Sequence, residues 1–250
     1  MYSILASLAA GGAVFAVVTL LMGPFAAILP AILAATIVLV ILLRRATNGA
    51  QTMLFPMQQM MQAGKVDEVE ELLVATRDQW GKWMPTLTGQ LEAQRGMLDY
   101  VRMQWDDALP KLQNGQWRNW MAQACIACIA YRKGDKETAY AGLEKATKTG
   151  KKEPLAWIVR AVLLSRDGKR DEALKALSEG LTHLPNHPQL TQLQKTIANK
   201  KRVDTARYGQ GWYQFFPEDL ARQMKASHGR NQFGPGFRGP KMTKAQHRGR

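Results

Sequence analysis

The stretch "PLAWIVRAVLLSRDGKRDEALKALSEGLTHLPNHP", residues 154–188, decides the fold of this 250-residue chain. Its apolar residues recur at helical spacing on both sides of a Gly–Lys pair, which indicates two amphipathic helices joined by a turn. The segment "GDKETAYAGLEKA" at 134–146 aligns with "GKRDEALKALSEG" at 168–180, which is 34 residues later. The alignment pairs small or apolar residues at four positions: Gly134 with Gly168, Ala139 with Ala173, Leu143 with Leu177, and Ala146 with Gly180. A unit of this kind cannot bury its apolar face alone, so the sequence predicts a stack of helix pairs.

A helix–turn–helix period of 34 residues resembles the tetratricopeptide repeat (TPR) family. The copy at 154–187 resembles the family most fully, with Trp157 at the aromatic place, Ala161 where the two helices cross, and Pro185 at the closing proline. The copy at 120–153 keeps the small residues but lacks the tryptophan and the closing proline. The resemblance implies a short all-α solenoid.

The repeat pattern weakens toward the N-terminus. A copy from about residue 91 has Gly96 and Ala108 at the small positions, and we expect Pro110 to shorten its second helix. An earlier helix pair turns at Gly64. After the last repeat, Leu190, Leu193 and Ile197 share one helical face, as in a capping helix, so we assign residues 53–200 to the repeat domain.

The resemblance also implies a binding groove, because TPR arrays typically bind an extended peptide or a helix along their first helices. Eight side chains are predicted to line it: Met97, Tyr100, Ala124, Cys128, Tyr131, Ile158, Val162 and Ser165. The Lys and Asn with which chaperone-binding members clamp a carboxylate are absent from these positions. We therefore expect a protein partner with an apolar or aromatic anchor, unless these side chains are ordinary core between helices.

The N-terminal 43 residues contain no charged side chain. As one helix they would reach about 65 Å, roughly twice the thickness of the hydrocarbon core. The Gly23–Pro24 pair near the middle favours a transmembrane helical hairpin over 1–45, with spans near 3–22 and 25–43. Small residues recur at every fourth position in both halves and would let the helices approach closely: Ser3, Ser7, Gly11, Ala27, Ala31 and Ala35.

The charges that follow the hairpin predict its orientation. No basic segment precedes the apolar run, so a cleaved signal peptide fits poorly, whereas Arg44 and Arg45 close the run. Basic residues stay on the cytoplasmic side, which predicts an integral inner-membrane protein with residues 44–250 in the cytoplasm. Two free cysteines suit that reducing compartment, and a periplasmic solenoid is the alternative.

An aromatic segment follows the repeats at 201–225. Four aromatic side chains lie within five residues: Trp212, Tyr213, Phe215 and Phe216. A short helix is expected to start near Pro217. Aromatic residues this dense rarely remain in water, so we expect them to dock on the chain's own solenoid. A partner protein or the membrane interface is the alternative.

The last segment, 226–250, combines basic residues with five glycines and no acid, so its composition predicts disorder. The polybasic tail is Lys225, Arg230, Arg238, Lys241, Lys244, Arg248 and Arg250. Near a membrane such charge attracts anionic lipid, and RNA is a less favoured partner. A tail that merely aids solubility would have the same composition.

No pattern indicates an enzyme, a cofactor or a metal. The "CIAC" at Cys125–Cys128 lies inside a helix that the repeat requires, whereas redox motifs of this spelling start a helix. Pro185 breaks the helix that would align His183 with His187. The adjacent acids Asp106–Asp107 and Glu70–Glu71 are expected on solvated helix faces.

These patterns favour a membrane-anchored scaffold whose repeats bind another protein. Two alternatives remain at this point: a membrane-surface or ribosomal RNA tether acting through the tail, or a small accessory subunit whose spans pack into a larger membrane complex.

Overall fold

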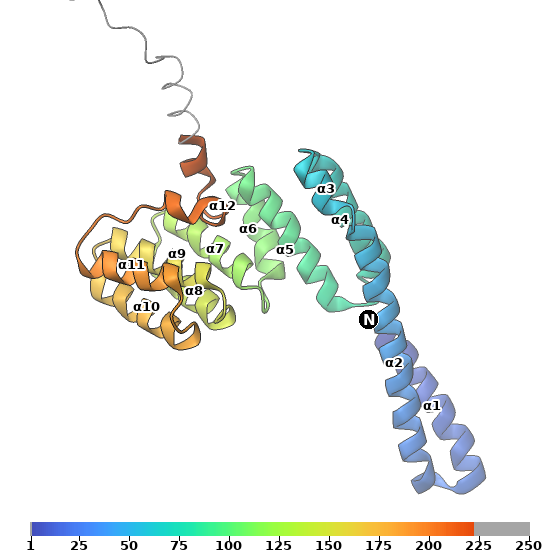
Figure 1. Cartoon of the computed structure of the whole chain (residues 1–250). Coiled ribbons are helices and arrows are strands. Elements are labelled where there is room, and N and C mark those ends of the chain that lie inside the picture. Colours follow the sequence, from blue (N-terminus) through green and yellow to red (C-terminus); the bar gives the residue numbers. More distant parts are fainter. Residues whose placement is uncertain (1, 223–250) are drawn as a thin grey trace, which may run out of the picture. The chain divides into compact units, whose positions relative to one another are not determined.

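The computed structural model describes residues 2–222, leaving out the side chains of Gln62 and Pro85, and every regular element in that range is a helix (Figure 1). The chain divides into two compact units, Met1–Asp204 and Thr205–Arg250. The helices of the first unit are α1 (Tyr2–Met22), α2 (Pro24–Leu54), α3 (Met57–Gln62), α4 (Val66–Trp80), α5 (Pro85–Val101), α6 (Trp105–Gly115), α7 (Trp120–Arg132), α8 (Lys136–Thr149), α9 (Pro154–Arg166), α10 (Arg170–His183) and α11 (Pro188–Ala198).

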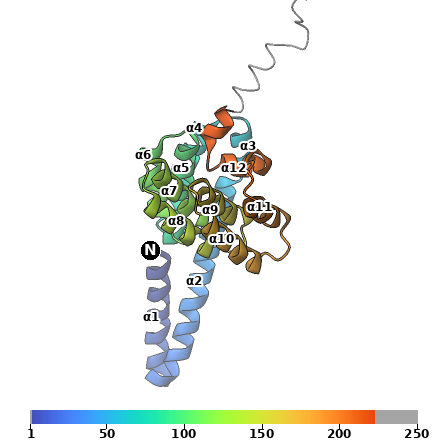
Figure 2. The same ribbon diagram turned by 90° about the vertical axis from the view of Figure 1, so that its left-hand side faces the viewer.

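Helices α1 and α2 form the expected hairpin and extend together away from the repeat helices (Figure 2). The chain reverses at Gly23, whose φ of 90° lies in the left-handed region that favours glycine. The predicted small residues lie between the helices: Ser3, Ser7, Gly11 and Ala27 are buried. A Cβ atom on Gly11 would lie 2.9 Å from that of Ala35, so the backbones approach too closely for a larger residue. Both helices are long and apolar enough to cross a membrane.

The second hairpin helix is longer than expected. The sequence predicts that the hairpin ends near residue 45, but α2 continues through 31 residues to Leu54, a length of about 46 Å. Arg44 and Arg45 mark the end of the apolar run without ending the helix, because arginine is a good helix former. Beyond them Ala46 and Ala50 are buried, so the same helix belongs to both the hairpin and the domain that follows.

Helices α2, α4 and α5 share an apolar cluster. Its buried members are Ala50, Val69, Leu73, Leu87, Leu91 and Leu98. A Cβ atom on Gly49 would lie 2.2 Å from the indole of Trp80, so α2 and α4 are in close contact there. The turn between α3 and α4 occurs at Gly64, as the sequence predicts, with φ 72°.

The two best repeats have matching helix bounds. Helices α7 and α9 have 13 residues each, α8 and α10 have 14, and each of their bounds recurs 34 residues later. Gly134 and Gly168 form the two turns with φ of 84° and 80°. Helix α5 contacts α7, and α7 contacts α9, as in a stack of helix pairs.

The upstream pair α5–α6 follows the same plan with two departures. Met103, with φ 63°, occupies the turn position that glycine fills in the other pairs. Helix α6 has 11 residues against 14 in α8 and α10, so the pair is shorter, yet the helix passes through Pro110 and ends at Gly115.

Helix α11 closes the stack. The three residues predicted to share its apolar face, Leu190, Leu193 and Ile197, are all buried, and the helix packs on α10 and α9. This placement covers the apolar side that the last repeat would otherwise expose.

The second unit contains a 3₁₀ turn (Ala206–Tyr208), α12 (Gly209–Tyr213) and a helix that begins at Pro217, as expected. The rings of Trp212 and Phe216 stack with centroids 4.4 Å apart. The Trp212 indole N–H donates to Asp219 Oδ2 at 3.0 Å, which links α12 to the helix after it.

Candidate functional site

The eight predicted groove residues lie on the first helices of three successive pairs. Met97 and Tyr100 are on α5; Ala124, Cys128 and Tyr131 are on α7; Ile158, Val162 and Ser165 are on α9. These helices contact one another in order, α5 with α7 and α7 with α9.

Most of this set is not accessible in the structure. Five members are buried: Tyr100, Ala124, Cys128, Ile158 and Val162. Met97, Tyr131 and Ser165 are half-buried. An open groove lined by all eight side chains is therefore not what the structure shows, and partner binding at this set stays a prediction.

Tyr100, predicted to line the groove, is fully buried within a polar and aromatic cluster. Its hydroxyl accepts a hydrogen bond from the Arg132 guanidinium at 2.7 Å. The same guanidinium lies 4.4 Å from the ring centre of Trp105 and donates to the Cys128 carbonyl at 3.2 Å. Burial, ahead of every other effect, raises the pKa of the Tyr100 phenol well above its ordinary value, so it stays protonated. The cluster joins α5, α6 and α7.

Tyr131 takes part in a second polar cluster around Asp167, at the turn of the next repeat. The carboxylate accepts hydrogen bonds from Tyr131 at 3.1 Å, from Lys136 at 2.7 Å, and from Tyr140. Burial alone would raise the pKa of Asp167, but the hydrogen bonds from Lys136, Tyr140 and Tyr131 outweigh it and lower the pKa. The ionised carboxylate thus holds α7, α8 and the α9–α10 turn together.

A hollow of about 580 Å³ lies between α8, α9 and α10, where the sequence indicated no site. Its lining is largely charged and comes from α8, α9 and α10: Tyr140, Ala141, Glu144, Lys148, Arg160, Leu164, Glu172, Lys175 and Glu179. Within it Arg160 faces Glu179 at 3.4 Å and Glu144 at 3.9 Å. Charges of both signs alternate, so the hollow has no evident preference for an anion or a cation.

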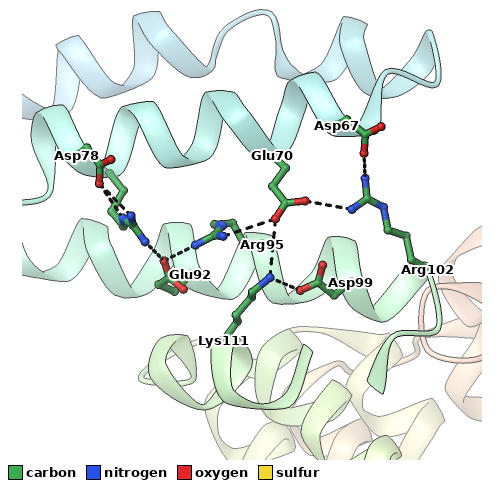
Figure 3. A network of polar contacts seen from close by, with 9 residues as sticks. Asp67, Glu70, Asp78, Glu92, Arg95, Asp99, Arg102 and Lys111 are labelled. Atoms are coloured by element: carbon green, nitrogen blue, oxygen red, sulfur yellow. Dashed lines mark hydrogen bonds and ion pairs between the residues drawn. The ribbon is translucent and has the colours of Figure 1, made fainter. Parts of the chain in front are cut away.

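A network of ion pairs joins α4 to α5 and α6 (Figure 3). Glu70 of α4 contacts Arg102 at 3.0 Å, Arg95 at 3.5 Å and Lys111 at 3.8 Å. Lys111 in turn donates to Asp99 at 2.6 Å, and the Asp99 side chain is only 4% exposed. One acidic residue on α4 therefore connects three helices.

The network continues along the two facing helices. Glu92 of α5 accepts from Arg77 at 2.9 Å and from Arg95 at 3.0 Å, while Arg102 also reaches Asp67 (Figure 3). The prediction that Glu70 lies on a solvated face is wrong, because its side chain is 27% exposed and paired; Glu71, Asp106 and Asp107 are exposed as expected. Asp67 and Glu70 are three residues apart and share one face of α4, and Arg95 and Arg102, the residue after α5, are seven apart and share one face of that helix. The sequence did not show that these two faces meet.

The ion pairs set the charge state of Glu70. Partial burial by itself would raise the pKa of this carboxyl, but the hydrogen bond from Arg102 and the charges of Lys111, Arg102 and Arg95 hold the pKa below the ordinary value of 4.5. Glu70 is therefore ionised at neutral pH, and the network is fully formed there.

The CxxC cysteines lie inside α7, and both thiols are buried. Burial raises the pKa of the Cys125 thiol well above its ordinary value, with the neighbouring Cys128 as the second cause. A thiol held neutral in this way is a poor nucleophile and a poor metal ligand. Among the residues that the structure describes, no group of three His, Cys, Asp or Glu side chains is placed to hold a metal ion.

The aromatic segment is largely buried. Trp212, Phe215 and Phe216 are buried and Tyr213 is half-buried. Their docking on the solenoid stays a prediction. The polybasic residues Lys225, Arg230, Arg238, Lys241, Lys244, Arg248 and Arg250 lie outside the described residues.

No protein-family model matches this sequence, and no curated protein matches it either.

Proposed function

We propose that the chain is a membrane-anchored, TPR-like scaffold that binds a protein partner through the first-helix side of its repeats and catalyses no reaction. Two observations together carry the proposal. The chain contains two matching 34-residue helix pairs, and its apolar hairpin is joined to the domain that follows because the second hairpin helix, α2, continues into that domain. The hairpin anchors the protein in the inner membrane, with residues 44–250 in the cytoplasm.

Membrane anchorage is supported by what the hairpin exposes. Phe25 is 90% exposed, Leu20 87% and Leu29 79%, although each is strongly apolar. Apolar surface of this kind is stabilised by about 25 cal/mol per Å² when it leaves water, and lipid provides that environment. Arg44 and Arg45 directly after the apolar run support the cytoplasmic side for the repeats.

The scaffold role is supported by the path of α2. A flexible linker would let the repeats move freely above the membrane, whereas α2 enters the domain core through Ala46 and Ala50. Anchorage raises the local concentration of whatever the repeats hold, so modest affinity is enough for recruitment.

The partner surface is best sought at the accessible first-helix positions. Met97, Tyr131 and Ser165 are half-buried and lie on three successive first helices, so a partner helix or strand could contact all three. The buried members of the predicted groove would support these positions from below.

Two serines on neighbouring helices allow a matched test. A photo-crosslinking amino acid would be placed at Ser165 on α9 or at exposed Ser178 on α10, in the full-length protein in its native membrane. We expect a discrete crosslinked protein at Ser165 that survives a high-salt wash and is absent at Ser178.

Three results would contradict the proposal. Equal crosslinking at both serines would exclude the first-helix side as the binding surface. Loss of all crosslinked proteins in high salt, or in a chain ending at Asp204, would support a tether acting through the cationic tail. Extraction of the protein by alkaline carbonate would exclude integral anchorage.

A further inference from the structure

Four connections of equal length link the successive pairs of the array. They join α4 to α5, α6 to α7, α8 to α9 and α10 to α11, and each has four residues: 81–84, 116–119, 150–153 and 184–187. Helices joined by connections this short pack antiparallel, so all four connections lie at one end of the stack and the turns at Gly64, Met103, Gly134 and Gly168 lie at the other. We call these two ends the connection end and the turn end.

The hairpin meets the array at the connection end. The Tyr2 backbone N–H donates to the Lys82 carbonyl at 3.0 Å, and the Ser3 hydroxyl donates to the Trp83 carbonyl at 2.5 Å. The rings of Tyr2 and Trp83 are in edge-to-face contact, with centroids 5.8 Å apart. Since α1 begins at Tyr2, the first connection lies level with the end of the span, where tyrosine and tryptophan favour the interface between lipid and water.

Charge is distributed unequally between the two ends. The connections contain four exposed basic residues, Lys82, Arg118, Lys151 and Lys152, and one acid, Glu153. The first turns of α5, α7, α9 and α11, which start at the connection end, contain no acid. The turns at the other end also carry basic residues, but the first turns of α4, α6, α8 and α10 there each carry one or two acids. Lys65, Lys133 and Lys169 are each paired with one of these acids.

The second connection adds an exposed aromatic ring. Trp117 is 69% exposed, and the guanidinium of Arg118 lies 5.5 Å from its ring centre. Arg118 has a φ of 54°, a left-handed conformation that favours glycine. An exposed tryptophan beside an arginine at this end has the composition of a membrane-interface contact.

We propose that the connection end of the array rests on anionic phospholipid headgroups and forms a second membrane contact beside the hairpin. Its contact residues are Lys82, Trp83, Trp117, Arg118, Lys151 and Lys152. The lipid surface is the occupant because this end continues from the hairpin through Tyr2 and Trp83 and has a basic excess that the turn end lacks. The inference rests on the proposed membrane anchorage of the hairpin. Its consequence is that the array lies along the membrane with its turn end toward the solvent.

Opposite ends of α6 provide a matched pair of reporter positions. Asn114 and Gln104 are both exposed, uncharged and polar, and they lie about 15 Å apart along the helix, with Asn114 at the connection end. The full-length protein would carry a bimane label on Asn114→Cys or Gln104→Cys, since the native cysteines are buried. A third label on Ile37→Cys, exposed in the hairpin, reports insertion itself.

Each labelled protein would be placed in nanodiscs of phosphatidylcholine alone or with added phosphatidylglycerol. A lipid with a nitroxide on its headgroup is the quencher for Asn114 and Gln104, and an acyl-chain doxyl lipid in separate nanodiscs is the quencher for Ile37. We expect strong quenching at Asn114, weak quenching at Gln104, and a further gain at Asn114 when phosphatidylglycerol is present. Replacing Lys82, Arg118, Lys151 and Lys152 by Gln should remove that gain, and Trp117→Ser should reduce quenching in both lipids. All five side chains are exposed, so the variants are expected to fold.

The outcomes separate this inference from the proposed function. Quenching at Ile37 by acyl-chain doxyl lipid, with equal and weak quenching at Asn114 and Gln104, would overturn the second contact and leave the anchor intact. No quenching at Ile37 would overturn both. If quenching at Asn114 is strong but is changed neither by the Gln variants nor by added phosphatidylglycerol, recognition of anionic lipid is contradicted as well. If a protein occupies this end instead, Asn114 is protected from quenching altogether.

Discussion

The N-terminal and C-terminal parts of the first unit are stabilised by different kinds of contact. Between α7 and α10 the core contacts are apolar and tightly packed: Ala127, Leu143, Ala161, Leu163 and Leu177 are at most 1% exposed, and charged contacts between these helices are found in the Asp167 cluster and the Arg160 pairs. Between α4, α5 and α6 an apolar cluster is accompanied by charged groups; the side chains of Arg77, Glu92, Glu70, Arg102, Lys111 and Asp99 are 4–32% exposed. The stability of the repeats should therefore respond less to salt than that of the junction between α4, α5 and α6.

This difference has a functional meaning for an anchored scaffold. In the proposed scaffold the repeats hold a fixed binding surface, and close apolar packing provides a single arrangement. The junction transmits the position of α2 to the array through α4, and ion pairs that water and salt can reach are weaker and more easily rearranged. We expect any movement of the array relative to the anchor to occur at the α4–α5 interface.

The largest effect is expected from Trp157→Ala. Trp157 is 3% exposed, its indole N–H donates to the Lys151 carbonyl at 3.1 Å, and a Cβ atom on Gly180 would lie 2.9 Å from its ring. Removing a buried aromatic ring of this kind costs about 3–5 kcal/mol. Native-state hydrogen exchange in nanodiscs should show this loss in the opening free energy of α9 and α10.

Trp117→Ala is the matched control, because the same ring is removed from a 69% exposed position. An exposed substitution should change the opening free energy by no more than about 0.5 kcal/mol. Similar losses in both variants would mean that the repeats are not stabilised by the packing described.

A smaller loss is expected from Lys111→Met at the junction. It leaves the Asp99 carboxylate, 4% exposed, without the partner that now donates to it at 2.6 Å. An unsatisfied group that is this well buried costs about 1–3 kcal/mol, reduced here because the Lys111 side chain is 24% exposed. Asp99→Asn in the same chain should recover part of the loss, and a double-mutant cycle measures the coupling. Additive effects of the two changes would contradict a direct pairing.

Acid should weaken the junction through Glu70. Because its pKa in the folded chain lies below the ordinary value of 4.5, the unfolded state binds the proton first as the pH falls. The stabilisation is present above about pH 4.5 and is lost as the pH falls through the lower, folded pKa. Glu70→Gln should therefore be less stable than the wild type at neutral pH, and this difference should shrink below pH 4.5.

Hydrogen exchange of α4 and α5 as a function of pH measures that difference. Glu71→Gln, which removes the exposed neighbouring carboxylate, is the control. If both variants keep a constant difference from the wild type across the acid range, the ion pairs of Glu70 do not stabilise the junction.

The sequence predicted the elements that depend on local patterns. Gly134 and Gly168 mark turns because few other residues adopt positive φ, and the 34-residue alignment placed the four surrounding helices. The apolar run before Arg44 predicted the hairpin in the same way, and its small residues lie between the two helices.

Features that depend on which helix faces meet were not predictable. Tyr100, Tyr131 and Ser165 occupy the same place in successive repeats, yet Tyr100 is fully buried because Arg132 and Trp105 cover it. Glu70 was expected in water because its partners, Arg95 and Arg102, lie 25 and 32 residues away and meet it only in the folded chain.

The smallest expected effect concerns the turn between α5 and α6, where this helix pair departs from the repeat pattern. Met103 has φ 63° at the place that Gly64, Gly134 and Gly168 fill elsewhere, and it is 42% exposed, so its side chain contributes little packing. A non-glycine residue in this region carries a cost of roughly 1–2 kcal/mol, and glycine loses part of that gain through its greater freedom in the unfolded chain. Met103→Gly should therefore stabilise α5 and α6 by up to about 1 kcal/mol in hydrogen exchange. Gly134→Ala should destabilise α7 and α8 by a similar amount. If Met103→Gly destabilises the pair instead, the methionine side chain has a binding or packing role at the turn end, and this departure from the repeat pattern would belong to the function of the array.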